Sequence, residues 1–384
     1  MRAHVDTGAV LERTRALVAV DTQNPPGNER EAIGVCRELL APFGARFEEF
    51  EPAPGRASLL ATVGEGGGGR PTLIVNGHLD VVPVHRPGWS RDPFAGELED
   101  GRLYGRGTAD MKGGIAAAIE ALAVLERAGR EAACDVVFQL VADEERGGGF
   151  GTGALVREGK VRGDACIVPE PTGLAVCVAE RGLFVCNITV HGRPAHGSEP
   201  RNGVSAVELG AKVVLALHGA EFAEQEHDLL GRPTCNVGTI NGGTGHNTVA
   251  ERCTIVADRR LLPGGTAESA EASLRARIDA IGDPDLRYEL SPDVYGEASE
   301  LDRSHPLVDD VQAALSAVRG RPSPVIGMRF TTDARFVRNQ AGIPAVVLGP
   351  GEIAQAHTND EFVAVDQLAD AAAVYAELFA TFDG

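Results

Sequence analysis

The strongest constraint on the fold is the alternation of strand-like and helix-like segments through the first half of the chain. Strand patterns at about 58–63, 72–77, 135–142 and 164–168 are largely apolar, and helix-like segments lie between them, of which the alanine-rich 111–128 is the clearest. Apolar strands that alternate with helices are typical of a mostly parallel sheet covered by helices on both faces. We therefore predict an α/β fold.

The pattern changes near residue 176. The segment AVCVAERGLFVCNITVHG predicts a hairpin-like pair of strands with no helix between them. Further strands and helices follow up to about residue 281, and the helix–strand alternation resumes near residue 303. This arrangement predicts a small α+β domain inserted into the larger one.

Charge and cysteine content limit the partners and the compartment. The chain has a formal net charge of −19, which argues against a nucleic-acid partner or an anionic membrane surface. It has no run of 18 apolar residues and no signal-peptide core at its start, so we expect neither a transmembrane helix nor secretion. Seven scattered cysteines without a C-x-x-C pair fit reduced thiols, and we predict a cytoplasmic protein.

Histidine and acidic side chains collect where the predicted strands end. In an open α/β sheet the carboxyl ends of the strands form the ligand-binding edge. The candidates are His78 and Asp80, the run Asp143-Glu144-Glu145, Glu170 and His357, with Asp110 in a glycine-rich turn before a helix. Each alone has a plainer interpretation: Asp110 could cap its helix, and the acidic run could be a solvated surface. Together at one edge, they favour a common function.

A metal pair explains why so many acids would share one edge. Packed carboxylates repel each other unless positive charge lies between them. Three carboxylates and two neutral imidazoles around two divalent cations is a balanced ligand set for zinc. Asp80 follows His78 by two residues, so it can accept the second imidazole N–H and fix the tautomer of the ring.

Several motifs, in order along nearly the whole chain, resemble the M20 family of co-catalytic dizinc metallopeptidases and amidohydrolases. They are GHLDVVP, GRGTADMKGG, ADEE, the Glu in PEPTG, GRPAHGSEP and GPGEIAQAHTNDEFV. The likeness is closest to the acetylornithine deacetylase and succinyl-diaminopimelate desuccinylase branch. It implies a discontinuous catalytic domain, residues 1–178 and 292–384, and an inserted lid domain, residues 179–291, that often dimerises.

The resemblance also implies roles for the polar residues. His78 and Glu170 would bind one zinc ion, Glu145 and His357 the other, and Asp110 would bridge them. Glu144 would be the general base, with Asp80 beside the metal as a further catalytic residue.

In the lid, His196 would support the oxyanion, and in dimeric members its counterpart reaches the partner's active site. Asn247, Arg260 and the backbone near Gly351 would hold a substrate carboxylate. Strand alternation places Asp258 and Arg260 on one face of their strand, opposite Arg259.

The implied activity is hydrolysis of the amide bond of an N-acyl-L-amino acid by a water that two zinc ions activate, with Co²⁺ or Mn²⁺ as substitutes. A carboxypeptidase or dipeptidase acting on a small peptide stays open, because it also cleaves an amide beside a carboxylate. A catalytically silent metal-binding protein is the alternative of another class. It is disfavoured because Glu144 and all five ligand candidates are present. The expected partners are a small-molecule substrate and a second copy through the lid.

Overall fold

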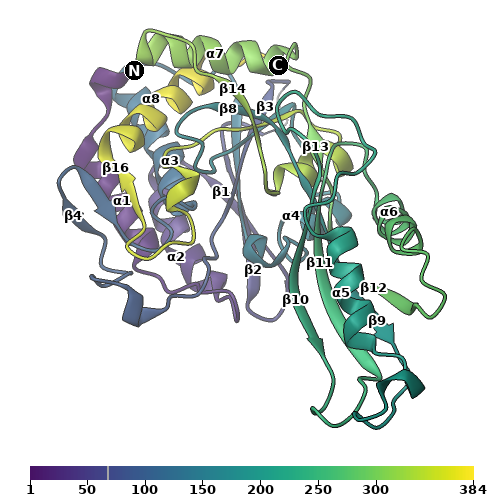
Figure 1. Ribbon diagram of the computed structural model, residues 1–384. Helices are drawn as coiled ribbons and strands as arrows, with labels where there is room; N and C mark the ends of the chain where they lie inside the picture. Colours follow the sequence, from purple (N-terminus) through teal and green to yellow (C-terminus); the bar gives the residue numbers. More distant parts are fainter. Residues whose placement is uncertain (67–68) are drawn as a thin grey trace. The chain divides into compact units, whose positions relative to one another are not determined.

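The computed structural model describes residues 1–66 and 69–384, which form two compact units (Figure 1). Unit 1 comprises Met1–Val178, Leu301–Ile326 and Thr332–Gly384, and unit 2 comprises Ala179–Glu300 and Gly327–Thr331. Unit 2 runs past residue 291, where we expected the inserted domain to end, because the last long strand of its sheet continues to Gly296.

The sheet of unit 1 is parallel at its centre and antiparallel toward its edges. Its strands are β1 (Arg46–Ala53), β2 (Arg56–Val63), β3 (Thr72–His78), β6 (Asp135–Val141), β7 (Ala165–Val168), β8 (Val176–Glu180), β14 (Val325–Met328) and β15 (Ala345–Val347). β3 pairs in parallel with β6 and β7, and β7 pairs in parallel with β15. β1, β2 and β8 add antiparallel pairs in the order β1-β2-β6-β3-β7-β15-β8. The predicted α/β fold with a mostly parallel sheet is confirmed.

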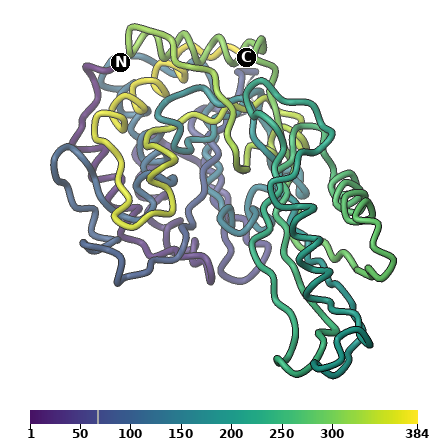
Figure 2. The backbone as a smooth tube through the Cα atoms, in the orientation of Figure 1, coloured from purple at the N-terminus to yellow at the C-terminus, as the bar shows by residue number. Residues whose placement is uncertain are grey.

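Helices from both ends of the sequence flank this sheet. They are α1 (Thr7–Val18), α2 (Glu29–Leu40), α3 (Lys112–Arg127), α4 (Thr152–Arg157), α7 (Pro306–Arg319) and α8 (Val365–Thr381). The C-terminal α8, yellow in Figure 2, packs against α1 and α3, while α2 packs on β2. Every residue of α3 from Lys112 to Leu125 is buried, and its many alanine and glycine residues allow close packing on all sides. In the described part of the chain, no helix combines the length and the apolar character needed to cross a membrane.

Unit 2 is built on an antiparallel sheet with helices on one face. Its strands are β9 (Gly182–His191), β10 (Thr234–Gly242), β11 (Arg252–Leu261) and β12 (Arg287–Gly296), in the order β10-β11-β9-β12, with a short β13 (Ser299–Glu300) paired to the end of β8. Helices α5 (Ala206–Leu217) and α6 (Ala267–Asp279) share one hydrophobic core with the inward-facing residues of β9.

The prediction of a hairpin-like pair of strands near residue 176 is wrong. β8 pairs with β13 and β15, whereas β9 pairs with β11 and β12. Arg181 alone separates the two strands, and one residue is too short a connection for a hairpin turn. The chain instead passes from one sheet to the other through Arg181.

A small sheet joins two distant segments of unit 1. β4 (Glu97–Glu99) and β5 (Arg102–Tyr104) form a hairpin, and β16 (Phe362–Ala364) pairs with β5. β5 leads toward Asp110 and β16 follows His357, so this sheet brings two of the predicted ligands toward the same place.

Candidate active site and metal centre

The first candidate ligand set lies at the carboxyl ends of two parallel strands and the start of a helix. His78 ends β3, Glu170 follows β7 and Asp110 precedes α3. His78 Nε2 lies 3.1 Å from Asp110 Oδ1 and 3.6 Å from Glu170 Oε1. All three residues are buried.

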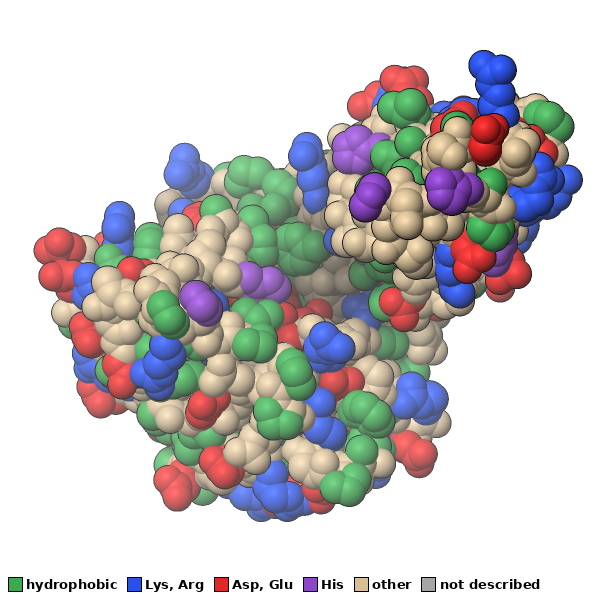
Figure 3. Space-filling model, turned by 60° about the horizontal axis from the view of Figure 1, so that its bottom comes forward, with side chains coloured by type: hydrophobic (Ala, Val, Ile, Leu, Met, Phe, Trp, Pro, Cys, Tyr) green, Lys and Arg blue, Asp and Glu red, His purple; other side chains and the backbone are tan. Residues whose placement is uncertain are grey.

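The second set uses the other oxygen of the same aspartate. His357 Nε2 lies 3.3 Å from Asp110 Oδ2 and 3.0 Å from Glu145 Oε2. Each set places one donor atom per residue within 4.8 Å of the others. In Figure 3, histidine side chains (purple) and acidic side chains (red) lie near one another on the side of unit 1 that faces the viewer. Asp110 therefore stands between two imidazoles, one to each oxygen.

These donors fit divalent cations. Zinc binds imidazole nitrogen and carboxylate oxygen at about 2.0–2.2 Å, so two tetrahedral ligands lie roughly 3.4 Å apart. The nitrogen-to-oxygen distances of 3.0–3.6 Å match this spacing. His78 Nδ1 bonds to the main-chain carbonyl of Asp80 at 2.9 Å, which leaves the Nε2 lone pair facing the carboxylates.

Asp80 differs from the expectation in how it acts. Its carboxylate lies 3.6 Å from His78 Nδ1, beyond hydrogen-bond range, because its main-chain carbonyl makes that bond instead. The carboxylate accepts the main-chain N–H groups of Glu144 and Glu145, each at 3.2 Å, and the side-chain amide of Asn24 at 2.8 Å. Asp80 therefore ties the turn that carries the predicted base to the strand end that carries His78.

Two glycines allow the central helix to approach both ligand loops. A Cβ at Gly113 would lie 2.2 Å from the Thr108 carbonyl oxygen, and one at Gly114 would lie 2.2 Å from the Pro169 carbonyl oxygen. Thr108 precedes Asp110 by two residues and Pro169 precedes Glu170. Any larger residue at either glycine would push a ligand loop away from α3.

Glu144 differs from the four carboxylates around it. Among the described residues, its carboxylate has no hydrogen-bond or ion-pair partner, whereas Asp80 accepts hydrogen bonds and Asp110, Glu145 and Glu170 each pair with an imidazole. Burial, opposed by His78 and reinforced by Glu170, raises the pKa of Glu144 well above its ordinary value. A raised pKa and a free carboxylate suit a group that accepts and returns a proton.

The ligand groups share protons when no cation is bound. Burial raises the pKa of Glu170 to about 8, with Asp110 adding to the effect. Hydrogen bonds to Asp110 and Glu145 raise the pKa of His357 to about 10. For His78, burial opposes protonation, but Asp110 and Glu170 outweigh it and hold its pKa well above the ordinary value. A bound cation would displace these protons.

We predict that the metal-free protein loses stability as the pH rises from 6 to 9. Glu170 keeps its proton in the folded state up to about pH 8 but releases it near 4.5 when unfolded, so its contribution declines across that interval. His357 contributes in the same direction between 6.5 and about 10. We expect Tm of the chelator-treated protein to fall by at least about 1 °C, the effect of roughly 1 kcal/mol on a chain of this length.

Calorimetry at pH 6, 7, 8 and 9, with and without added Co²⁺, measures this. Because the metal replaces protons, its stabilisation should grow over the same range. A metal-free Tm that stays level or rises with pH would contradict the proton sharing described for Glu170 and His357.

In unit 2, the structure brings His196 and Asn247 together. His196 forms a bridge with Thr248, and the Gly197 N–H donates to the Asn247 carbonyl at 2.8 Å. The Ser198 main-chain N–H donates to His196 Nδ1 at 3.2 Å, so the neutral ring carries its proton on Nε2. His196 is thus set up as a hydrogen-bond donor on an exposed loop.

Arg260 lies far from that loop within the unit. On β11, Arg252 pairs with His191 and Arg260 pairs with Leu183, eight strand steps away, roughly 26 Å at the usual rise. Asn247 precedes Arg252, so one small carboxylate cannot touch both Asn247 and Arg260 of one chain. The Arg260 guanidinium forms a two-point pair with Asp258, at 3.0 and 3.1 Å.

Gly351 is not free to bind a substrate through its own amide. It is buried, its N–H donates to Gln367 Oε1 at 2.7 Å, and its carbonyl accepts from the Gly173 N–H at 2.7 Å. Both hydrogen-bonding groups of the Gly351 backbone are therefore occupied within unit 1.

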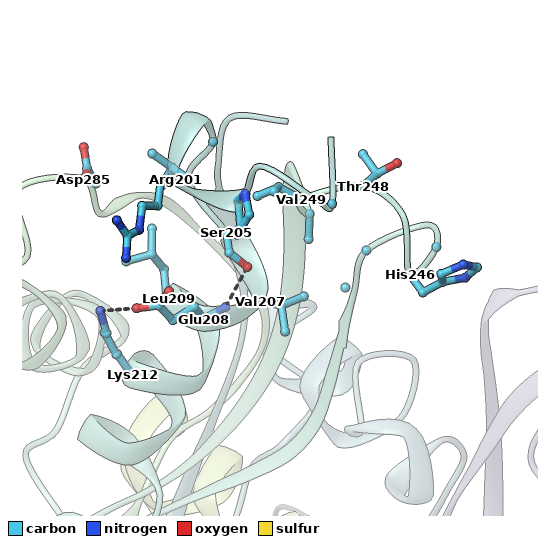
Figure 4. Close-up of a pocket in the computed structure, with 18 of the residues that line it drawn as sticks. Arg201, Ser205, Val207, Glu208, Leu209, Lys212, His246, Thr248, Val249 and Asp285 are labelled. Carbon is cyan, nitrogen blue, oxygen red and sulfur yellow. Dashed lines mark hydrogen bonds and ion pairs between the residues drawn. The ribbon is translucent and has the colours of Figure 1, made fainter. Parts of the chain in front are cut away.

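A cavity of about 750 Å³ in unit 2 holds none of the predicted site residues (Figure 4). It lies at the start of α5, where Ser205 caps the helix and Lys212 points to Glu208. Lys212 pairs with Glu208 at 2.8 Å and with Asp283 at 3.0 Å. Lys212, Glu208 and Asp283 therefore partly neutralise one another at this cavity.

Sequence analysis missed two polar residues that support the site. Asn24, which we interpreted only as part of a turn, binds the carboxylate of Asp80. Glu361 binds the turn of Asp110 from within the motif that contains His357. The signal for Glu361 was its position four residues after a ligand candidate, but its partner lies about 250 residues earlier.

Adjoining ligand sets with a free carboxylate beside them define a metal-dependent hydrolase. Residues 74–381 match the model of Peptidase family M20/M25/M40, and the chain belongs to this family. It is 33% identical over 369 residues to an acetylornithine deacetylase from Edwardsiella ictaluri (strain 93-146), covering 93% of this chain and 91% of that one.

Solved structures share the fold. The structure of aminopeptidase PepT from Bacillus cereus superposes with a TM-score of 0.81 at 24% identity, covering 98% of both chains. A Bacillus subtilis protein described as a dinuclear metal-binding peptidase of the M20 family has a TM-score of 0.71 at 14% identity, covering 99% of this chain and 98% of that one.

Proposed function

We propose that this M20 hydrolase cleaves the amide bond of an N-acyl-L-amino acid, with two zinc ions held by His78, Asp110, Glu145, Glu170 and His357. The observation that carries the proposal is the shared aspartate, whose two oxygens face the imidazoles of two separate ligand sets. The relationship to a deacetylase favours the acyl amino acid as substrate. Co²⁺ and Mn²⁺ suit the same nitrogen and oxygen donors.

The residues of the chain have distinct tasks in this reaction. Cations in the two ligand sets would polarise the amide carbonyl and would lower the pKa of a bound water toward about 7. Glu144 takes the proton of the attacking water and passes it to the leaving amine. The carboxylate of Asp80 keeps Glu144 in place by accepting the main-chain N–H of Glu144. Arg260 would grip the substrate carboxylate in exchange for Asp258, since a guanidinium suits two-point binding.

A substrate panel tests the proposal. We expect N-acetyl and N-succinyl amino acids, with added zinc or cobalt, to be hydrolysed faster than dipeptides that carry the same C-terminal residue. Faster cleavage of the dipeptides would establish the carboxypeptidase or dipeptidase activity instead. Two bound ions without hydrolysis of any compound would favour the silent metal-binding alternative.

We further propose a homodimer formed through unit 2. A single chain separates His196 and Asn247 from Arg260 by the length of β11, so a small substrate held by all three needs a second copy. The edge strand β10 and the helix α5 expose Ile240 and Leu215, the latter by 84%. Sedimentation that gives the mass of one chain at micromolar concentration would contradict this proposal.

A further inference from the structure

Glu361 is a fully buried carboxylate whose side chain binds the turn that ends in Asp110. Its exposed fraction is 0%, and it follows His357 by four residues. Its Oε1 accepts the main-chain N–H groups of Gly107 at 3.0 Å, Ala109 at 2.9 Å and Asp110 at 3.1 Å. Three N–H groups directed at one oxygen fix the orientation of this turn.

The rest of Glu361 is held as firmly. Its Oε2 accepts from Arg106 Nη1 at 2.6 Å, and the Arg106 guanidinium lies 5.2 Å from the centre of the Trp89 ring. The Glu361 carbonyl accepts from the Gly105 N–H at 2.8 Å. Directly after it, Phe362 of β16 pairs with Tyr104 of β5. The carboxylate therefore cannot shift without disturbing a charge pair and a strand pair.

We propose that Glu361 is a positioning residue for the metal pair. It joins the turn that presents Asp110 to the segment that presents His357, and these are two ligands of the same candidate set, 3.3 Å apart. The inference rests on the proposed function, because it requires that this set holds a cation. Loss of a group that orients a metal ligand typically costs about 10–100-fold in metal affinity.

A purely structural role is the competing explanation, and paired variants separate the two. Glu361→Gln keeps the shape, but its amide nitrogen must face either the three main-chain N–H groups or Arg106. Glu361→Asp keeps the charge, but its side chain is one methylene too short to reach both Arg106 and the three main-chain N–H groups. Asp135→Asn is the matched control: Asp135 is equally buried and accepts the N–H groups of Glu65 and Gly66 at 3.0 and 2.8 Å, at the opposite end of β6.

Co²⁺ titration of the metal-free proteins by calorimetry, with the bound metal counted by elemental analysis, is the test. We expect the dissociation constant to rise about 10–100-fold in both Glu361 variants and to change less than about 2-fold in Asp135→Asn. In the metal-free state, the amides of residues 107–110 should exchange hydrogen faster in the Glu361 variants only.

The possible failures are distinguishable. Wild-type affinity for two Co²⁺ ions in either folded Glu361 variant would overturn the positioning role, even if its melting temperature falls. If one Glu361 variant does not fold, the other carries the test. Wild-type protein that takes up fewer than two Co²⁺ ions would refute the proposed function and, with it, the premise of this inference.

Discussion

Glu144→Gln is expected to lower kcat by about 10²–10⁴-fold while the protein still binds two metal ions, because glutamine has the shape of glutamate but cannot accept a proton. The described residues give the Glu144 carboxylate no partner, so its loss should disturb the surrounding structure little. Its main-chain bond to Asp80 survives the substitution. The loss should therefore appear in kcat, with KM nearly unchanged.

Steady-state kinetics and metal analysis on the same preparation check this result. The control is Glu158→Gln, an exposed glutamate at the end of α4, which should keep wild-type kinetics. A Glu144→Gln enzyme that keeps more than about a tenth of wild-type kcat would remove the base role, since general base catalysis is worth at least about 10²-fold. Loss of metal together with activity would point to Glu144 as a ligand.

The ligand cluster could be anticipated from the sequence because the geometry of the sheet determines where most of the candidate ligands lie. The carboxyl ends of neighbouring parallel strands meet at one edge, so His78, Glu145 and Glu170 had to lie near one another once β3, β6 and β7 were recognised. Asp110 followed from its position before α3. Their roles as ligands stay predictions that metal analysis must test.

Contacts that depend on side-chain direction or on distant pairing could not be anticipated. Whether the carboxylate or the carbonyl of Asp80 meets His78 is decided by the local backbone, which no motif encodes. The bond between Glu361 and Asp110 joins segments about 250 residues apart. The edge strand β1 (RFEEFEPA) was also missed, because it is mostly exposed and its charged residues conceal the alternation that reveals a buried strand.

Asp110→Asn should have the widest effect on metal binding, because both oxygens of this carboxylate are in use. Oδ1 faces His78 and Oδ2 faces His357, so an amide nitrogen on either side opposes one imidazole with a donor where an acceptor stood. We expect at least one of the two ions to be lost and kcat/KM to fall by at least about 10²-fold. This is at least as large as the activity loss of about 10–100-fold that follows when a residue supporting a metal ligand is removed.

Elemental analysis after dialysis against limiting zinc, followed by assay with excess Co²⁺, measures both effects. The matched control is Asp100→Asn, in the exposed β4–β5 turn, where the backbone φ of +47° suits asparagine as well as aspartate. Because the two ligand sets share Asp110, loss of one ion should also weaken the other, so excess metal should restore activity only in part. Full occupancy by two ions in Asp110→Asn would show that the sets are independent, and the shared aspartate would then no longer support a paired-metal mechanism.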